Sequence, residues 1–184
     1  MTRGKWFSWL TAFSWLLLAV MFGCESSRSK PNGEQRVIQE IRAIGGEVTV
    51  SLGKVVRVNL SSKPVTDGDL VTLGRFADLQ NLNLADTTIT DDGLRHLAQF
   101  KRLRELTLSG CPNITGAGLL HLQALRNLYK LQLSGNQQLK NDAMVALWPM
   151  RSLGKLDIYK TGVDDHGYNE LVRRLPALKG NITH

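Results

Sequence analysis

Two histidines, His96 and His121, are the residues that could most easily form a metal site. They lie 25 residues apart in a chain whose apolar residues recur at nearly the same interval, so stacking would bring the two imidazoles together. Paired imidazoles can bind a transition metal. The equivalent positions hold Thr72, Ala146 and Glu170, which supply at most one distant carboxylate and no supporting second shell. We therefore predict two surface histidines and no metal site.

Cys111 is the residue whose chemistry could make it a nucleophile. A catalytic thiol needs a base held beside it, and the sequence places none near the turn that contains Cys111 and Pro112. We predict a small, buried, apolar filler at this position. Paired catalytic carboxylates, a phosphate-binding glycine loop and a Ser-His-Asp arrangement are also not recognisable. The sequence therefore predicts no enzyme activity and no cofactor.

The charge balance is mildly basic. Twenty-three Lys and Arg residues against 16 Asp and Glu give a net charge of +7. The excess is spread along the chain, which does not match the concentrated basic patch of a nucleic-acid-binding protein. The two cysteines, Cys24 and Cys111, are far apart in sequence, so a disulfide framework is not expected.

Residues 1–24 predict an export signal. A cationic start (MTRGK) precedes the apolar stretch Trp6–Phe22, and Gly23 and Cys24 follow. The ending resembles a bacterial lipoprotein box, in which Cys24 would be lipidated and become the mature N-terminus. An uncleaved membrane anchor and a cleaved signal without lipid stay open as alternatives. Residues 25–34 are polar and contain Ser, Pro and Gly, which predicts a disordered tether.

A repeat of about two dozen residues organises the rest of the chain. The unit is clearest in Leu79–Arg102, where Leu79, Leu82 and Leu84 follow an L-x-x-L-x-L spacing. The same pattern begins at Val55, Leu79, Leu103, Leu128 and Leu153, in steps of 24, 24, 25 and 25 residues. A fixed period of this length predicts a stacked-repeat solenoid. Residues 55–177 are thus one repeat domain.

Each repeat predicts a strand, a turn and a helix. The strands centre on Val58, Leu82, Leu106, Leu131 and Leu156, and stacking would make them a parallel sheet. The helices would begin at the capping residues Thr66, Thr90, Thr115 and Asp164. Lys140 occupies this position in the fourth repeat, so Asn141 or Asp142 is expected to cap there. The apolar residues of the helices recur at three-residue steps, for example Leu119, Leu122 and Leu125.

The flanking segments predict end caps. Residues 35–54 form an N-terminal cap, with a short amphipathic helix over Gln35–Ile44 and a strand through Val48 and Val50. Residues 178–184 are too short for another repeat and predict one edge strand through Ile182. A solenoid needs such caps because its end repeats would otherwise expose the core.

The repeats resemble the leucine-rich repeat family, and most closely its members with an I-T-D-x-G-L motif. That motif is Ile89–Leu94 (ITDDGL), with weaker copies at Val65–Leu70 (VTDGDL) and Ile114–Leu119 (ITGAGL). Ser109–Thr115 (SGCPNIT) is similar to the cysteine-containing subclass found in F-box substrate adaptors. The resemblance implies a right-handed α/β superhelix, with a parallel sheet on the concave side and helices on the convex side. It also implies binding rather than catalysis.

The strand residues between the leucines are the predicted binding site, because they point out of the core onto the concave sheet. The candidates are Arg57, Asn59, Asn81, Asn83, Glu105, Thr107, Lys130, Gln132, Lys155, Asp157 and Tyr159. Equivalent residues of adjacent strands would form ladders spaced by about 4.8 Å. These side chains donate and accept hydrogen bonds, which suits an extended polypeptide or a glycan.

A stripe of cations is predicted where the helices end. Lys101, Arg126 and Arg151 recur at 25-residue steps, and Arg102 and Arg104 extend the stripe. These five residues are called the basic edge below. Cations at helix C-termini are explained by the helix dipole. Contact with anionic lipid or a wall polymer is the sharper alternative.

These observations favour an exported, membrane-tethered binding module without catalysis, whose partner is a protein or an envelope polymer. A structural component that assembles through its repeat ends is the first alternative. A substrate adaptor similar to F-box leucine-rich repeat proteins is the second, but no F-box precedes the repeats and the export signal argues against it. The sequence leaves the oligomeric state and the ligand open.

Overall fold

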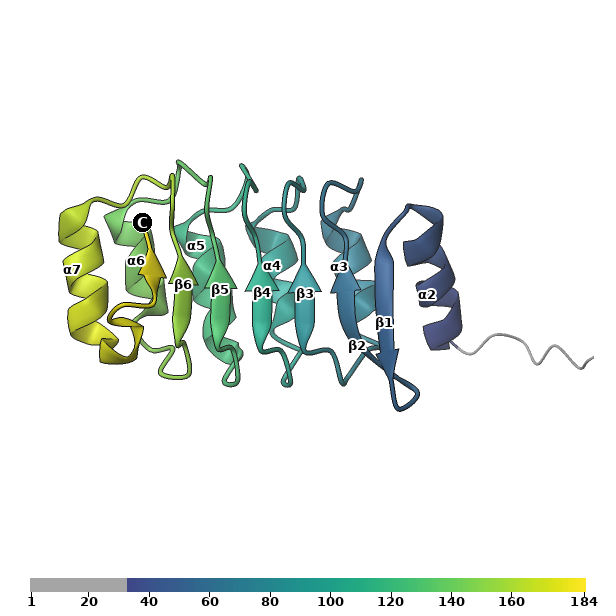
Figure 1. The fold of residues 1–184 in the computed structure, drawn as a ribbon. Coiled ribbons are helices and arrows are strands. Elements are labelled where there is room, and N and C mark those ends of the chain that lie inside the picture. Colours follow the sequence, from purple (N-terminus) through teal and green to yellow (C-terminus); the bar gives the residue numbers. More distant parts are fainter. Residues whose placement is uncertain (1–32) are drawn as a thin grey trace, which may run out of the picture. The chain divides into compact units, whose positions relative to one another are not determined.

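The computed structural model describes residues 33–184, which form two layers (Figure 1). One layer is a seven-stranded sheet whose strands follow chain order from β1 to β7. The other is a row of helices behind it. The predicted export signal, Cys24 and most of the tether lie outside the described residues. Among the described helices, none has the length and apolar character needed to cross a membrane.

The predicted parallel sheet is confirmed. Strands β2 to β7 run parallel, and their central residues Val58, Leu82, Leu106, Leu131 and Leu156 are aligned in one register. The strands are β2 (Lys54–Asn59), β3 (Asn81–Asn83), β4 (Glu105–Thr107), β5 (Lys130–Gln132), β6 (Lys155–Asp157) and β7 (Ile182–Thr183). The leucines of the repeats are buried in one continuous core between sheet and helices. Burial of this apolar surface is the main force that holds successive repeats together.

The helical layer changes character along the solenoid. Its elements are α3 (Asp67–Leu73), α4 (Asp91–Leu97), α5 (Gly116–Leu119), η1 (Leu120–Ala124), α6 (Asn141–Met144), η2 (Val145–Leu147), α7 (Asp165–Arg174) and η3 (Pro176–Leu178). In the third and fourth repeats a short α-helix continues as a 3₁₀-helix. A 3₁₀-helix has three residues per turn, so it keeps apolar residues at three-residue steps on one side. This accounts for the spacing of Leu119, Leu122 and Leu125.

Both predicted end elements are present. Helix α2 (Gly33–Ala43) buries Val37, Ile38 and Ile41 against the first repeat. Strand β1 (Glu47–Ser51) follows it and pairs antiparallel with β2. At the other end, β7 is the edge strand expected through Ile182, and the ring of His184 stacks on Tyr168 at 4.1 Å.

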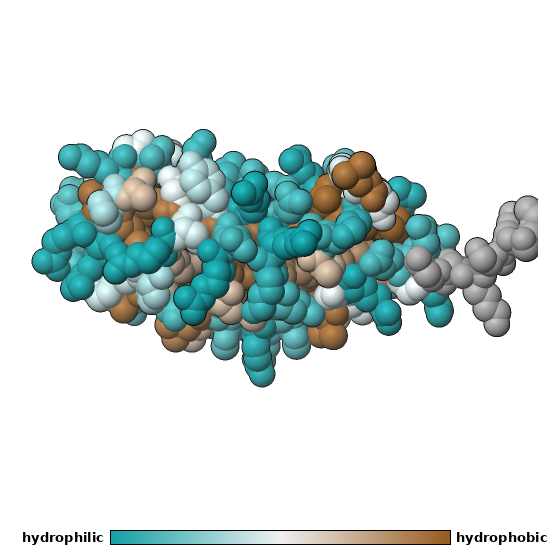
Figure 2. All heavy atoms as spheres, turned by 90° about the horizontal axis from the view of Figure 1, so that it is seen from below, coloured by the Kyte–Doolittle hydropathy of each residue, from teal (hydrophilic) through white to brown (hydrophobic). Residues whose placement is uncertain are grey.

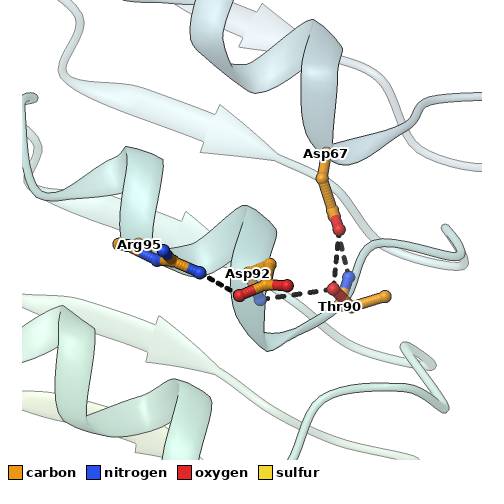
Figure 3. A network of polar contacts seen from close by, with 4 residues as sticks. All are labelled: Asp67, Thr90, Asp92 and Arg95. Atoms are coloured by element: carbon orange, nitrogen blue, oxygen red, sulfur yellow. Dashed lines mark hydrogen bonds and ion pairs between the residues drawn. The ribbon is translucent and has the colours of Figure 1, made fainter.

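Adjacent repeats are joined by a side-chain clamp at the start of the helices (Figure 3). Asp67, the first residue of α3, accepts hydrogen bonds from the backbone N–H (2.9 Å) and the hydroxyl (2.6 Å) of Thr90, which caps α4. Asp91 accepts the same two bonds from Thr115 in the next repeat, at 2.7 and 2.5 Å. The clamp links residues about one repeat apart, so it fixes the stacking of whole repeats.

Glycines make room for these clamps. A Cβ on Gly93 would collide with the Asp67 carboxylate, and a Cβ on Gly118 would collide with that of Asp91. The seam between the third and fourth repeats has the reverse arrangement. There the clamp position holds Gly116, and the following repeat has Ala143 in place of the glycine. A Cβ on Gly116 would lie 2.9 Å from the Cα of Ala143.

The expected cap of the fourth helix is wrong. Lys140 stands at the N-cap of α6, and no side chain caps this helix. Asn141 does not turn back onto its own helix, because its side chain serves the next repeat. Its Oδ1 accepts from the backbone N–H of Asp164 (3.1 Å), and its Nδ2 donates to Asp164 Oδ1 (2.7 Å). Asn141 is therefore the clamp residue of this seam.

Candidate functional site

Ten of the eleven predicted binding residues form two ladders across the sheet face. The first-position ladder consists of Arg57, Asn81, Glu105, Lys130 and Lys155, paired in that order. The third-position ladder consists of Asn59, Asn83, Thr107, Gln132 and Asp157. The eleventh residue, Tyr159, follows β6. No helix of the described residues covers this side of the sheet in Figure 1, so the ladders face outward.

The third-position ladder uses its oxygens to end the strands. The side-chain oxygens of Asn59, Asn83 and Asp157 accept hydrogen bonds from backbone N–H groups two residues further on, at 3.2, 3.0 and 3.0 Å. This is the Asx turn favoured by these residue types. It leaves Asn83 Nδ2 as a donor without a partner among the described residues. The sequence alone did not show that the side-chain oxygen of these residues closes a turn while the Nδ2 donor of Asn83 is available to a ligand.

The first-position ladder is charged, and its charges are unpaired. Within residues 33–184, no ion pair involves Arg57, Glu105, Lys130 or Lys155. Lys130 and Lys155 are direct neighbours on adjacent strands. Like charges in this position destabilise a sheet. The pair is therefore better suited to an external acidic group than to stability.

Two hollows lie on the sheet face. A hollow of about 220 Å³ over β1 to β4 is lined by Glu47, Arg57, Asn81, Asn83 and Glu105 among others. A hollow of about 270 Å³ over β5 to β7 is lined by Lys130, Gln132, Lys155, Asp157 and Asn181 among others. The face is thus divided into an N-terminal half with both charge signs and a C-terminal half that carries the two lysines.

Two tyrosines flank the C-terminal hollow. Tyr129 and Tyr159 are each 50% exposed. The ring of Tyr129 lies over Gly154, where a Cβ would collide with it. The ring of Tyr159 carries the ammonium group of Lys160 at 5.3 Å from its centroid. Half-exposed aromatic rings are common anchors in interfaces. Gly154 occupies the position equivalent to Tyr129 in the next repeat. A glycine there leaves room for the Tyr129 ring, so this residue could have predicted where the ring lies.

The basic edge lies where the helices end, and some of its members contact backbone carbonyls. Lys101 Nζ donates to Ala98 O (2.6 Å), and Arg151 Nη1 donates to Arg174 O (3.0 Å). These bonds match the helix-terminus explanation for the cations. Arg126 is exposed and has no ion pair or side-chain hydrogen bond among the described residues.

One carboxylate organises the N-terminal part of this edge. Asp78 forms ion pairs with Lys54 (2.8 Å) and with Arg102. The hydrogen bond from Lys54 holds the pKa of Asp78 below its ordinary value, and the charge of Arg102 acts in the same direction. Asp78 therefore joins the start of β2 to the basic edge.

The two chemical candidates, the histidine pair and Cys111, lie in different surroundings. His96 and His121 lie partly exposed on the helical layer. The described residues contain no cluster of three or more His, Cys, Asp or Glu that could hold a metal. Cys111 is buried, and burial raises the pKa of its thiol.

Cys111 is more than an apolar filler. Its Sγ donates to Leu84 O (3.2 Å), and its backbone N–H is bound by Asn136 Oδ1 (2.7 Å). Asn136 is 0% exposed, and its Nδ2 also donates to Leu108 O and Leu133 O, both at 2.8 Å. Thr87 closes the equivalent turn of the second repeat in the same way, through its hydroxyl. These residues satisfy buried carbonyls at the turns, as buried polar groups require.

Comparison with known proteins agrees with the repeat architecture. A family model described as Leucine Rich repeat matches residues 78–98. No curated protein matches the sequence. The family match and the repeats described above identify the fold as a leucine-rich repeat solenoid.

Several solved structures are similar to this chain. Internalin C2 from Listeria monocytogenes is 22% identical, with a TM-score of 0.41, and the match covers 70% of this chain and 65% of that one. A leucine-rich repeat protein of Leptospira interrogans is 19% identical, with a TM-score of 0.39 and coverage of 58% and 32%. The Mex67:Mtr2 subunits of Chaetomium give 17% identity, a TM-score of 0.41 and coverage of 47% and 66%. In each case this chain spans less than two thirds of the other chain.

Proposed function

We propose that this protein is a non-catalytic binding module that takes an extended polypeptide along its sheet face. The observation that carries the proposal is the row of charged side chains in the first-position ladder, which have no ion-pair partner within the described residues. Charged side chains keep a surface soluble, but placing Lys130 next to Lys155 adds repulsion between like charges and does not stabilise the sheet. An extended chain offers backbone N–H and C=O groups along its whole length, which the polar side chains of the ladders could bind.

The details of the face favour a polypeptide over a featureless polymer. The free amide donor of Asn83 suits a backbone carbonyl, and Lys130 and Lys155 suit a carboxylate. Tyr129 and Tyr159 offer apolar surface with a polar tip beside the C-terminal hollow. An envelope polymer with acidic groups is the other ligand that these side chains would accept.

The location of the module is part of the proposal and is based on the sequence of residues 1–34. The apolar stretch Trp6–Phe22 and the following Cys24 support export and tethering to a membrane, through a lipid on Cys24 or through an uncleaved anchor. The polar residues 25–34 would then hold the repeats off the bilayer.

Position-specific crosslinking of the full chain in its native cells tests the function. A photoreactive residue at Gln132, in the middle of the sheet face, should crosslink to a polypeptide. The same residue at Asn169, exposed on α7, is the matched control and should not. Equal yields at the two positions, or a crosslinked product that resists protease, would contradict a polypeptide on the sheet face.

Two substitutions then test how the ligand is held. Asn83→Asp keeps the oxygen that accepts from Ala85 N–H but removes the Nδ2 donor, so the fold is maintained while a ligand bond is lost. Tyr159→Ala removes the aromatic anchor. Each should lower the crosslinking yield at Gln132 severalfold. Unchanged yields in both variants would mean that the ligand does not use these groups.

The structure does not favour assembly through the repeat ends. The clamp position of the last repeat, Asp165, is 95% exposed and could in principle receive another repeat. The first repeat of a second copy does not fit there, because it has Asp69 where a clamped repeat has glycine. Asp69 also already binds the N–H and hydroxyl of Thr66, both at 2.8 Å. Helix α2 covers that end of the core as well.

A further inference from the structure

The β1–β2 hairpin ends in an apolar residue that the fold does not explain. Leu52 is 99% exposed and has a φ of 50°, followed by Gly53 with a φ of 75°. A two-residue turn with both φ values positive strongly prefers Asn-Gly. A leucine in the left-handed region is strained. Leu52 therefore disfavours the folded state locally and gains no burial in return, which is typical of residues kept for a contact outside the chain.

The hairpin tip lies on the side of the solenoid where the helices end and the next strands begin. This is also the side of the basic edge. Lys54, two residues after Leu52, contacts Asp78, and Asp78 contacts Arg102 of the basic edge. Figure 2 looks onto this side of the repeats and shows a mostly hydrophilic surface with several smaller hydrophobic areas, one of which protrudes at the upper right. The ion pairs thus link the strand that begins two residues after Leu52 to the basic edge.

The charge at this end is strongly one-sided. Five segments connect a helix to the next strand here, namely residues 74–80, 98–104, 125–129, 148–154 and 179–181. They contain seven cations, Arg75, Lys101, Arg102, Arg104, Arg126, Arg151 and Lys179, and one acidic residue, Asp78. Asp78 is already neutralised by its two partners. Contacts with helix-end carbonyls explain Lys101 and Arg151 but not the whole set.

The repeat domain also begins at this end. Arg75 Nη1 lies within 2.6 Å of the position that a Cβ would take on Gly33, so the start of α2 is beside the turn that follows α3. The residues before Gly33 are the polar tether and the apolar leader. The chain therefore leaves the domain from the same end that carries the cations and Leu52.

From these three observations we propose that this end docks on an anionic phospholipid bilayer, with Leu52 inserted among the lipids and the basic edge on the headgroups. A cation near an anionic membrane surface strengthens binding about fivefold, and an apolar side chain at the interface adds its burial. Docking through this side would place the strands roughly perpendicular to the membrane and leave the sheet face open to a ligand. The inference does not depend on what that face binds.

Depth-dependent quenching in vesicles tests the docking. The full chain is reconstituted into vesicles of phosphatidylcholine, with or without phosphatidylglycerol, that contain acyl-chain nitroxide lipid. A fluorophore is attached at Leu52→Cys, or at Gln137→Cys on an exposed turn at the opposite end of the strands. Both variants carry Cys24→Ser, and Cys111 is buried, so neither native cysteine competes for the label. We expect strong quenching at position 52 and little at 137, and only when phosphatidylglycerol is present.

Charge removal supplies the second arm. Lys101→Gln, Arg126→Gln and Arg151→Gln together should lower the ratio of docked to undocked protein by about a hundredfold, and quenching at position 52 should fall to the level at 137. A Lys63→Gln, Lys140→Gln and Lys160→Gln variant removes the same charge from the opposite turns and should behave as wild type. Equal quenching at 52 and 137, or quenching that does not depend on phosphatidylglycerol, overturns the proposal. None of these variants changes a residue of the sheet face. The docking test is therefore independent of the crosslinking test at Gln132, and either can fail without the other.

Discussion

Asp91 shows how one side chain can serve two repeats. It is the first residue of α4, where a carboxylate is favoured by the helix dipole, and it also binds Thr115 at the start of the next helix. At the sequence level, helix capping and the helix dipole are enough to explain aspartates at the helix starts. The structure shows that Asp67 and Asp91 also bind the neighbouring repeat.

Replacing Asp91 with alanine should therefore destabilise the protein more than a surface substitution does. Asp91→Ala leaves the N–H of Thr115 without its acceptor, so we expect a loss of about 1–2 kcal/mol in the free energy of unfolding. Urea denaturation measures this. Asp92→Ala removes an exposed carboxylate that pairs with Arg95 of the same helix and should cost less than about 0.5 kcal/mol. Equal losses in the two variants would rule out a special role for the clamp.

The thiol of Cys111 should be unreactive while the protein is folded. Burial raises its pKa, so little thiolate forms near neutral pH, and the side chain is also inaccessible. An aromatic disulfide reagent at pH 8 should label Cys111 only at the rate of unfolding, and should label it at once in denaturant. Rapid labelling of the native protein would show that the turn opens readily and that Asn136 does not close it.

At the scale of the element, the helix starts are matched in pairs. A repeat with glycine three residues after its N-cap follows a repeat with Asp or Asn at the clamp position. Gly93 follows Asp67, Gly118 follows Asp91, and Gly167 follows Asn141. The exception, Ala143, follows Gly116. The methyl group of Ala143 takes the space that a clamp side chain would occupy.

This pairing predicts a compensating double substitution. Gly93→Ala should cost about 1–3 kcal/mol, because its Cβ collides with the Asp67 carboxylate. Adding Asp67→Gly should remove part of that cost, so that the coupling energy exceeds about 1 kcal/mol in a double-mutant cycle measured by denaturation. Gly68→Ala, where the added Cβ meets no contact closer than 3.7 Å, is the control and should be neutral or stabilising. Additive effects of Gly93→Ala and Asp67→Gly would contradict the steric pairing.

The elements themselves were largely predictable from sequence, and their connections were not. Apolar spacing located every repeat strand and the helix starts, because burial of leucine imposes the same period on both. The clamp from Asn141 to Asp164 was missed because it joins residues that become neighbours only after stacking. The eleven candidate binding residues were predicted from the alternation of the strands, but which half of the Asn83 amide is free depends on the turn after β3.

At the scale of the molecule, acid should weaken the fold. Hydrogen bonds and ion pairs lower the pKa values of Asp78, Asp164 and Glu170 in the folded state. Such carboxylates contribute stability above their unfolded pKa of about 4, and the contribution is lost as the pH falls through the folded pKa. The unfolding midpoint in urea should therefore drop steadily below about pH 5.

Asp78→Asn isolates one part of this effect. The variant loses its ion pairs with Lys54 and Arg102, so it should be less stable at pH 7 and should lose less stability on acidification. Asp142→Asn, at an exposed position without an ion pair among the described residues, should keep the slope of wild type. A wild-type slope in Asp78→Asn would mean that the contacts of this carboxylate do not contribute to acid sensitivity.

The position of Leu52 near the basic edge could not be predicted from the sequence, because it depends on strand pairing. Leu52 continues the alternation of Val48 and Val50, so the sequence reads it as one more strand residue. Only the antiparallel pairing of β1 with β2 places it at the hairpin tip, two residues before the Lys54 that contacts Asp78. The basic edge by contrast recurs with the repeats and was visible as a stripe. The position of Arg75 beside Gly33 depends on how α2 packs, which no spacing rule gives.

The seam between Gly116 and Ala143 has a consequence for the ancestry of the protein. If the third repeat were excised, Asp91 would meet Ala143, and its carboxylate would find a methyl group in its place. If the third repeat were copied in tandem, Gly116 would face Gly118, and the new junction would lack a clamp. The repeats are therefore not interchangeable. Gain or loss of a repeat in this lineage would need a compensating substitution at the new junction.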